Sequence, residues 1–418
     1  MSEWREYTIG DICSKITSGG TPNTRKNEYY GGEIPWVRTQ EVNFNRIYDA
    51  EIKITEDGLN NSSAKWIPEN SVIIAMYGAT AGKVAINKIP VTTNQACCNL
   101  IINSDKADYR FIYYNILSRF SNIANMAVGG AQQNLNAGMI KDLPVFLPDL
   151  PTQTAIAEIL SSLDDKIELN NKINKELENL AQTLFKRWFI DFEFPNENGE
   201  PYKSSGGEMV DSELGEVPKG WEVGNLNQIA QLVKKNIKPF ENPDKLYFHY
   251  SLPEFDSGKL PSNDLGATIL SSKYQVLEHS ILVSKLNPRI PRVWTVISPK
   301  PNSICSTEFQ VLKPINQLYF PFVNYLCKSV NYLSAIKSKV TGTSSSHQRV
   351  NPLDLINYEL VLPDINIVER FNNLTYNSLR QIDDNISENQ VLTNLRDTLL
   401  PKLISGELEV KQVLSQTT

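Results

Sequence analysis

An internal duplication is the feature that most limits how this chain can fold. Matching residues recur at a separation of 217 positions near the start of each copy and 215 positions further on. The pairs are Trp4 and Trp221, Pro22 and Pro239, Pro148 and Pro363, Ile167 and Ile382, Asn170 and Asn385, and Asn174 and Asn389. A separation held over so many residues indicates two copies of one unit, so the 418 residues predict two similar halves and not three unrelated domains.

The first part of each copy has the pattern of a mixed α and β domain. Short apolar runs, such as residues 71–76 and 91–102, alternate with clusters of Gly, Pro and Asn, which is typical of strands and turns. We expect one amphipathic helix in each copy, near residues 108–124 and 322–337. The fold class is therefore predicted as α+β, with two mixed α/β domains.

The second part of each copy is predicted to be one long helix. Seam residues recur at alternating steps of four and three, which is a heptad pattern. In the first helix they are Ile156, Leu160, Leu163, Ile167, Asn170, Asn174, Leu177, Ala181, Leu184 and Trp188. In the second they are Phe371, Thr375, Ser378, Ile382, Asn385, Asn389, Leu392, Arg396, Leu399 and Leu403.

Four asparagines occupy seam positions that an apolar seam would fill with Leu: Asn170, Asn174, Asn385 and Asn389. A seam Asn lowers stability and selects register and partner. One interpretation is that each helix packs only on its own domain. The other is that the two helices pair antiparallel as a coiled coil, with the asparagines meeting in the middle of the seam.

The two patterns together divide the chain into five segments. These are a first globular domain at 1–148, a first helix at 149–194, a linker at 195–220, a second globular domain at 221–363 and a second helix at 364–410. The linker is polar and rich in Gly, as inter-domain crossings are.

The overall charge hides an uneven distribution. The chain has a formal net charge of −6, which taken whole argues against a basic nucleic-acid-binding protein. Counted by segment, residues 1–146 are neutral, 147–220 carry −8, 221–362 carry +5, and 363–418 carry −3. The acidity thus belongs to the helices and linker, and the second globular domain keeps a basic surplus suited to phosphate contact.

The sequence lacks the residue patterns of several enzyme classes. In residues 77–85, YGATAGKVA, the Gly spacing is one residue too short for a phosphate loop, and Val84 stands where Ser or Thr would bind Mg²⁺. No GxGxxG, GxSxG or DPPY-type run is present. We expect no catalytic residues and no cofactor in this chain.

Cysteine and histidine usage favours a reducing compartment without a metal site. The five cysteines form no CxxC pair, and three separate histidines cannot supply normal zinc-ligand spacing. The N-terminal residues lack an apolar signal region, and no apolar run approaches the roughly 20 residues that span a bilayer. We expect a cytoplasmic protein.

Several motifs resemble one known family, the specificity subunits of type I restriction–modification systems. They are SGGTP (18–22), IPWVRTQEV (34–42), AMYGATAGKVAI (75–86), TNQACCNLI (93–101), the run from Gly129 to Leu160, and SELGEVPKGWEV (212–223). The second copy departs from the pattern, with ILVSKLNPRIPRVWTV (281–296) in place of the Gly-rich turn. Divergence is expected in this family, because each unit reads a different half of the target.

The resemblance implies a function and a set of partners. Each globular domain would be a target-recognition domain that reads one half of a bipartite double-stranded DNA site, and the paired helices would set the spacer. The pseudo-two-fold duplication would recruit two methyltransferase subunits, and two restriction (motor-nuclease) subunits would complete the complex. S-adenosylmethionine, ATP and Mg would bind those partners.

Polar and basic loop residues beside these motifs are the candidate DNA contacts, because Arg pairs with guanine and Asn or Gln with adenine. In the first copy they are Thr21, Arg25, Lys26, Arg38, Thr39, Gln40, Lys83, Gln132 and Gln133. In the second they are Lys234, Lys235, Lys285, Asn287, Arg289, Arg292, His347, Gln348 and Arg349. Two other function classes stay open from sequence alone: a stand-alone DNA-modifying enzyme with an unrecognised cofactor site, and a coiled-coil scaffold.

Overall fold

The structure is a computed structural model that describes residues 3–128, 134–340 and 348–411. Its contacts divide the chain into two compact units, one of Met1–Glu168 with Gln390–Thr418 and one of Leu169–Asn389. The long helices α6 (Leu150–Phe185) and α11 (Ile365–Ile404) each contribute residues to both units. The units are therefore described one at a time.

The first unit is built on a five-stranded sheet in the order β2-β9-β6-β7-β4. These strands are Cys13–Ser18, Cys97–Ile102, Val72–Ala75, Val84–Asn87 and Asn45–Ile47. A three-stranded sheet, β5-β3-β8, holds Lys53–Ile54, Tyr30–Val37 and Thr92–Thr93, and β1 (Arg5–Thr8) pairs with β10 (Pro144–Leu147). The helices are α1 (Ile9–Ile12), α2 (Glu56–Asn60), α3 (Tyr109–Ser118), α4 (Phe120–Val128) and α5 (Ala137–Lys141).

The core of the first unit explains why these strands form. Every residue of β6 and β7 is buried and all but Asn87 are apolar, so both strands are buried on both faces and do not alternate. The helix α3 buries Phe111, Ile112 and Ile116 in one apolar cluster with side chains of β6 and β7. The end of the chain returns to this unit, where Leu408 and Val410 pack on the cluster and Gly406 lies against the Trp4 indole.

The second unit repeats the arrangement with one strand fewer in its main sheet. The four-stranded sheet β14-β22-β19-β20 holds Ala230–Val233, Phe309–Pro314, Ser280–Ser284 and Val293–Val296. A five-stranded sheet, β15-β18-β21-β16-β17, holds Asn236–Ile237, Lys273–Gln275, Ser303–Cys305, Leu246–Tyr250 and Ser262–Leu265. β13 (Glu222–Asn225) pairs with β23 (Glu359–Leu362), as β1 pairs with β10. The helices are α7 (Leu252–Asp256), α8 (Phe320–Lys328), α9 (Val330–Ser338) and α10 (Pro352–Ile356).

The shared strand order confirms the predicted fold class and duplication. Strands β2-β9-β6-β7 and β14-β22-β19-β20 are paired in the same sequence, all antiparallel. β4 adds a parallel edge strand in the first unit alone. Residues 195–220, expected as a linker, contain a hairpin of β11 (Met209–Ser212) and β12 (Gly215–Pro218).

The expectation of a single amphipathic helix near residues 108–124 and near 322–337 was wrong, because each of these regions forms two helices, α3 and α4 in the first and α8 and α9 in the second. Arg119 leaves helical geometry between α3 and α4, with ψ at 13°. Ser329 adopts an extended conformation between α8 and α9, and its hydroxyl accepts a hydrogen bond from the Tyr332 amide at 3.3 Å. Serine is a preferred N-cap because it satisfies an amide that the new helix leaves unpaired.

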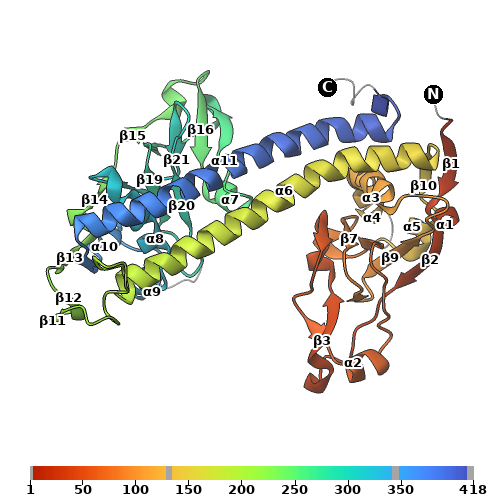
Figure 1. Cartoon of the computed structure of the whole chain (residues 1–418). Coiled ribbons are helices and arrows are strands. Elements are labelled where there is room, and N and C mark those ends of the chain that lie inside the picture. The colour runs from red at the N-terminus through yellow and green to blue at the C-terminus, as the bar shows by residue number, and fades with distance from the viewer. Residues whose placement is uncertain (1–2, 129–133, 341–347, 412–418) are drawn as a thin grey trace. The chain divides into compact units, whose positions relative to one another are not determined.

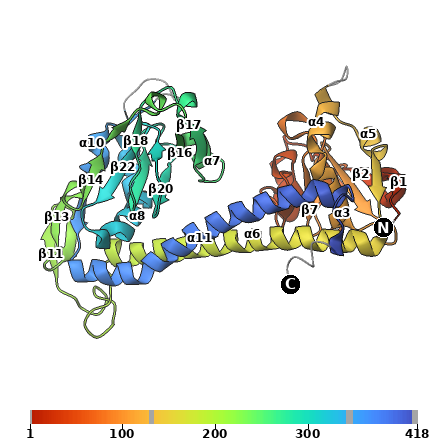
Figure 2. The same ribbon diagram turned by 90° about the horizontal axis from the view of Figure 1, so that it is seen from above.

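The two long helices pair antiparallel, as predicted, and both views show them side by side (Figures 1 and 2). Within the second unit, Asn170 donates to Asn389 Oδ1 at 2.9 Å and Asn385 donates to Asn174 Oδ1 at 2.8 Å. Residue numbers increase along α6 from 170 to 174 while those of their partners on α11 decrease from 389 to 385, so the two helices are antiparallel. Asn170 and Asn385 are only 1% and 4% exposed, and their part in selecting register stays a prediction.

All five cysteines are unpaired, and four of them are buried. In the part of the chain that the structure describes, no cluster of His, Cys, Asp or Glu could hold a metal ion. Among the same residues, no helix combines the length and apolarity needed to cross a bilayer.

Candidate nucleic-acid interface

In the first unit, strand register brings several predicted contacts to one edge of the main sheet. β2 and β6 end at this edge, and β9, β7 and β4 begin there, since Ser18 pairs with Cys98, Ala75 with Cys97 and Asn45 with Ala85. The loops that leave the edge carry Thr21, Gln95, the turn 77–83 and Asn43. Loops at one end of a sheet are a common place for binding residues.

Contacts between these loops fix their polar side chains. The Thr21 hydroxyl donates to Gln95 Oε1, and Lys83 Nζ donates to Asn43 Oδ1 at 2.7 Å. Lys83 Nζ also lies 5.7 Å from the centre of the Phe44 ring. Lys83 is therefore held by uncharged partners, so these contacts do not balance its positive charge.

Arg38, Thr39 and Gln40 follow β3 near the same loops, because the Asn94 amide donates to the Val37 carbonyl at 3.0 Å. The Arg38 guanidinium is bound to Glu51 at 2.6 Å, which neutralises its charge. Thr39 and Gln40 begin the short 3-10 turn Thr39–Glu41.

Arg25 and Lys26 make their contacts within their own exposed turn. The Arg25 amide donates to Asn23 Oδ1 at 3.0 Å, and Lys26 Nζ donates to the Tyr29 hydroxyl at 3.0 Å. Gln132, Gln133 and His347, also predicted as contacts, lie outside the described residues.

The second unit gathers its predicted residues at the corresponding edge. β14 and β19 end there and β22 and β20 begin there, since Val233 pairs with Val311, Ser284 with Phe309 and Val283 with Val293. Lys234 and Lys235 directly follow β14 and are exposed, and the turn between β19 and β20 spans residues 285–292. The predicted lysines and this turn thus come from different strands to one edge.

Residues 348–350 add a further segment to this edge. The Asn287 amide donates to the Gln348 carbonyl at 2.8 Å, and the Val350 amide donates to the Lys285 carbonyl at 3.0 Å. Neither contact could be foreseen from sequence, because more than 60 positions separate the segments. The side-chain oxygens of Asn287 and Gln348 are buried without a hydrogen-bond partner in the described structure.

Two predicted arginines at this edge are neutralised by carboxylates. Arg292 binds Asp256 through two hydrogen bonds of 2.8 and 2.7 Å, and Arg349 binds Glu308 at 2.9 Å. These contacts raise the pKa of both guanidinium groups. Among the described residues, no ion pair involves Lys234, Lys235 or Arg289, so these cations are the better candidates for phosphate.

Sequence reasoning missed four residues of these edges: Asn43, Tyr77, Gln95 and Glu308. Tyr77 is 42% exposed in the Gly-rich turn, and Gln95 and Asn43 hold two of the predicted contacts. Only strand register identifies them, because none belongs to a charged cluster in sequence.

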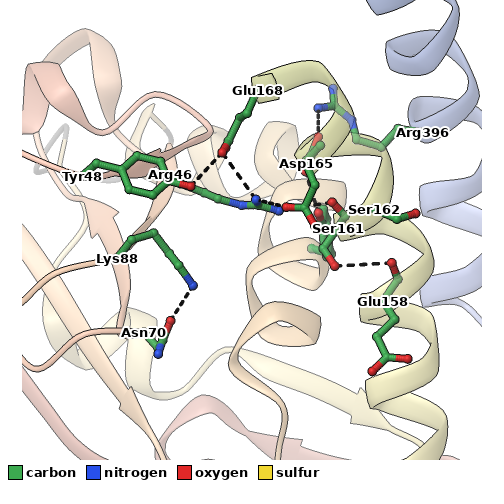
Figure 3. Close-up of polar contacts among 12 residues, drawn as sticks. Arg46, Tyr48, Asn70, Lys88, Glu158, Ser161, Ser162, Asp165, Glu168 and Arg396 are labelled. Carbon is green, nitrogen blue, oxygen red and sulfur yellow. Dashed lines mark hydrogen bonds and ion pairs between the residues drawn. The ribbon is translucent and has the colours of Figure 1, made fainter. Parts of the chain in front are cut away.

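A second polar cluster joins the sheet of the first unit to α6 (Figure 3). Arg46 on β4 binds the carboxylates of Asp165 and Glu168, and the Tyr48 hydroxyl donates to Glu168 at 2.8 Å. Burial by itself would lower the pKa of Arg46, but the two carboxylates raise it overall. Arg46 and Asp165 also line a cavity of about 150 Å³ with Lys88, Arg110 and Tyr114.

Because its cations are already paired or hydrogen-bonded, we interpret the cluster around Arg46 as structural. Lys88 Nζ donates to Asn70 Oδ1 at 2.7 Å, and Arg110 binds Asp108 at 2.7 Å. A recognition surface would instead be expected to leave cations available to a ligand.

Comparison with known proteins finds similarity to DNA specificity subunits. Residues 1–179 match the family model described as the type I restriction modification DNA specificity domain. The MjaIX specificity subunit of Methanocaldococcus jannaschii is 29% identical over 430 residues, covering 98% of this chain and 95% of the relative. The HindI specificity subunit of Haemophilus influenzae is 24% identical over 475 residues, covering 98% and 100%.

A solved structure supports the fold independently. The S subunit of a type I restriction–modification system from M. genitalium aligns over 96% of both chains with a TM-score of 0.58 at 17% identity. At that identity the likeness concerns the fold alone.

Proposed function

We propose that the chain is a specificity subunit of a type I restriction–modification system and that it reads a two-part DNA site, with one half for each unit; its similarity to such subunits over nearly its whole length supports this. The observation that carries this proposal is the repeated sheet edge. Both units present loops at the same end of the same strand order, yet the side chains differ. Two equivalent surfaces with different side chains suit two different half-sites.

The chemistry available at each edge fits this division of labour. Lys83 in the first unit and Lys234 and Lys235 in the second are suited to phosphate, which positions a protein on DNA without specifying sequence. Asn and Gln side chains are suited to base edges. We assign the remaining predicted contacts only to the same surfaces, since their individual roles depend on the bound DNA.

We propose that the chain itself catalyses no reaction and binds no cofactor. Two methyltransferase subunits would supply S-adenosylmethionine chemistry, and two restriction subunits would supply ATP- and Mg-dependent cleavage. The absence of catalytic motifs in the sequence supports this assignment.

The test is a methylation assay with the full chain, its methyltransferase partner and S-adenosylmethionine. The complex is expected to methylate DNA at a two-part site, while the chain alone methylates nothing. Methylation by the chain alone would favour a stand-alone enzyme, and methylation by the partner with unchanged specificity when the chain is omitted would favour a scaffold.

A further inference from the structure

The turns at the two sheet edges are built on the same backbone plan. Met76, which follows β6, accepts a hydrogen bond on its carbonyl from the Leu135 amide at 3.0 Å. Lys285, which follows β19, accepts one from the Val350 amide, also at 3.0 Å. Leu135 and Val350 are themselves 215 positions apart, so Met76 and Lys285 are equivalent positions.

Two residues after these equivalent positions, both backbones turn left-handed. Gly78 has φ at 72° and Asn287 has φ at 47°. Glycine adopts this conformation without a steric penalty, and Asn does so at some cost. The first unit thus has no side chain at this point of the turn, while the second unit presents a carboxamide.

Two hydrogen bonds hold the backbone of Asn287, while its side-chain oxygen has no donor among the described residues. The Asn287 amide donates to the Gln348 carbonyl at 2.8 Å, and the Asn287 carbonyl accepts from the Ile290 amide at 2.9 Å. In the described structure, Asn287 Oδ1 and Gln348 Oε1 are both buried without a partner. Buried polar atoms are usually paired, so these two neighbouring oxygens are acceptors that a ligand donor could satisfy.

We propose that Asn287 reads an adenine in the half-site of the second unit, with Gln348 beside it. A carboxamide accepts a hydrogen bond from the adenine N6 amine and donates one to N7, which distinguishes adenine from the other bases in the major groove. Lys234 and Lys235 at the same edge attract the phosphates. Gly78 holds the equivalent position in the first unit and has no side chain that could contact a base there. This assignment rests on the proposed function.

The test uses the full chain in complex with its methyltransferase and a DNA library randomised across the second half-site. Asn287→Gly removes the carboxamide and relieves the left-handed backbone, so the chain should still fold. We expect it to lose an adenine preference at one position by about tenfold, with the first half-site unchanged. Asn287→Asp should lose the same preference, because a carboxylate cannot donate to N7.

Asn302→Gly is the matched control, since Asn302 is another left-handed asparagine of the second unit, with φ at 64°. Its specificity should equal that of the wild type. If Asn287→Gly or Asn287→Asp retains every base preference, the adenine assignment is overturned. If instead the wild-type complex shows no two-part specificity, it is the proposed function that fails.

Discussion

The two units attach their globular parts to the long helices in different ways. In the first unit, Tyr114 on α3 donates to Asp164 Oδ2 at 2.6 Å, and Asp164 also binds Arg396 at 2.7 Å. The corresponding residue on α8 is Tyr325, because Phe111 and Tyr114 match Phe322 and Tyr325 in spacing. The Tyr325 hydroxyl is buried without a hydrogen-bond partner in the described structure.

The helix positions opposite these tyrosines explain the difference. A shift of 215 positions relates Asp164 to Leu379 and Arg396 to Ala181, and both apolar residues are buried. In their place the second unit packs aromatic rings, including Phe189 against Phe322 at 4.8 Å and Phe189 against Phe371 at 5.0 Å between ring centres. The duplicated tyrosine thus donates to a charged network in the first unit. In the second unit its hydroxyl has no partner among the described residues, although Lys328, which is paired with Glu178, lies 5.5 Å from the centre of the Tyr325 ring.

The largest expected effect comes from removing the cation of the first network. Arg396→Ala leaves the Asp164 carboxylate, only 13% exposed, without its ion pair, and we expect a loss of about 3 kcal/mol in the free energy of unfolding. Chemical denaturation measures it. The double variant Asp164→Leu with Arg396→Ala copies the second unit and should recover most of that loss. A double variant as unstable as the single one would contradict the comparison.

The two tyrosines should respond oppositely to loss of the hydroxyl. Tyr114→Phe removes a hydrogen bond to a carboxylate and should cost about 2 kcal/mol. Tyr325→Phe removes an unsatisfied buried group and should be neutral or stabilise by up to about 1 kcal/mol. Equal losses in the two denaturation curves would show that the networks do not differ in this way.

The asparagines of the helix seam should act on register more than on stability. Asn170→Leu combined with Asn385→Leu replaces two buried amides with side chains that an apolar seam accepts. We expect a folded chain that forms additional oligomers, detectable by light scattering with size-exclusion chromatography. Leu169→Asn, at an exposed position of α6, is a suitable surface control. An unchanged hydrodynamic size for the double variant would argue against the register role.

The smallest expected effect is a difference between the two units in how their stability depends on pH. All three histidines lie in the second unit, and burial lowers the pKa of His249 and His279 from 6.5. Below about pH 6.5 the histidines of the unfolded chain take up protons that those of the folded chain do not. The free energy of unfolding therefore decreases as the pH is lowered.

When the pH is lowered from 7 to 5, we therefore expect the backbone amides of the second unit to lose their protection against hydrogen exchange first. The variant with His249→Gln and His279→Gln should reduce that difference. Parallel loss of protection in both units of the wild type would contradict the expected order.

Sequence alone predicted the duplication, the mixed domains and the antiparallel helices, because these follow from repeats and periodicity. It failed at residues 108–124 and 322–337, where Arg119 and Ser329 interrupt the helices through backbone conformations that periodicity does not reveal. The pairing of Asn287 with Gln348 and of Asp164 with Arg396 was also out of reach. Such contacts join distant segments, and only strand register and helix packing bring them together.

In the proposed function, each unit reads its own half of the DNA site. The most direct measurement replaces residues 1–146 with the first recognition unit of another family member and maps the methylated DNA sequence of the full complex. We expect the first half-site to change and the second to stay as in the wild type. A motif in which both halves change, or neither does, would contradict it.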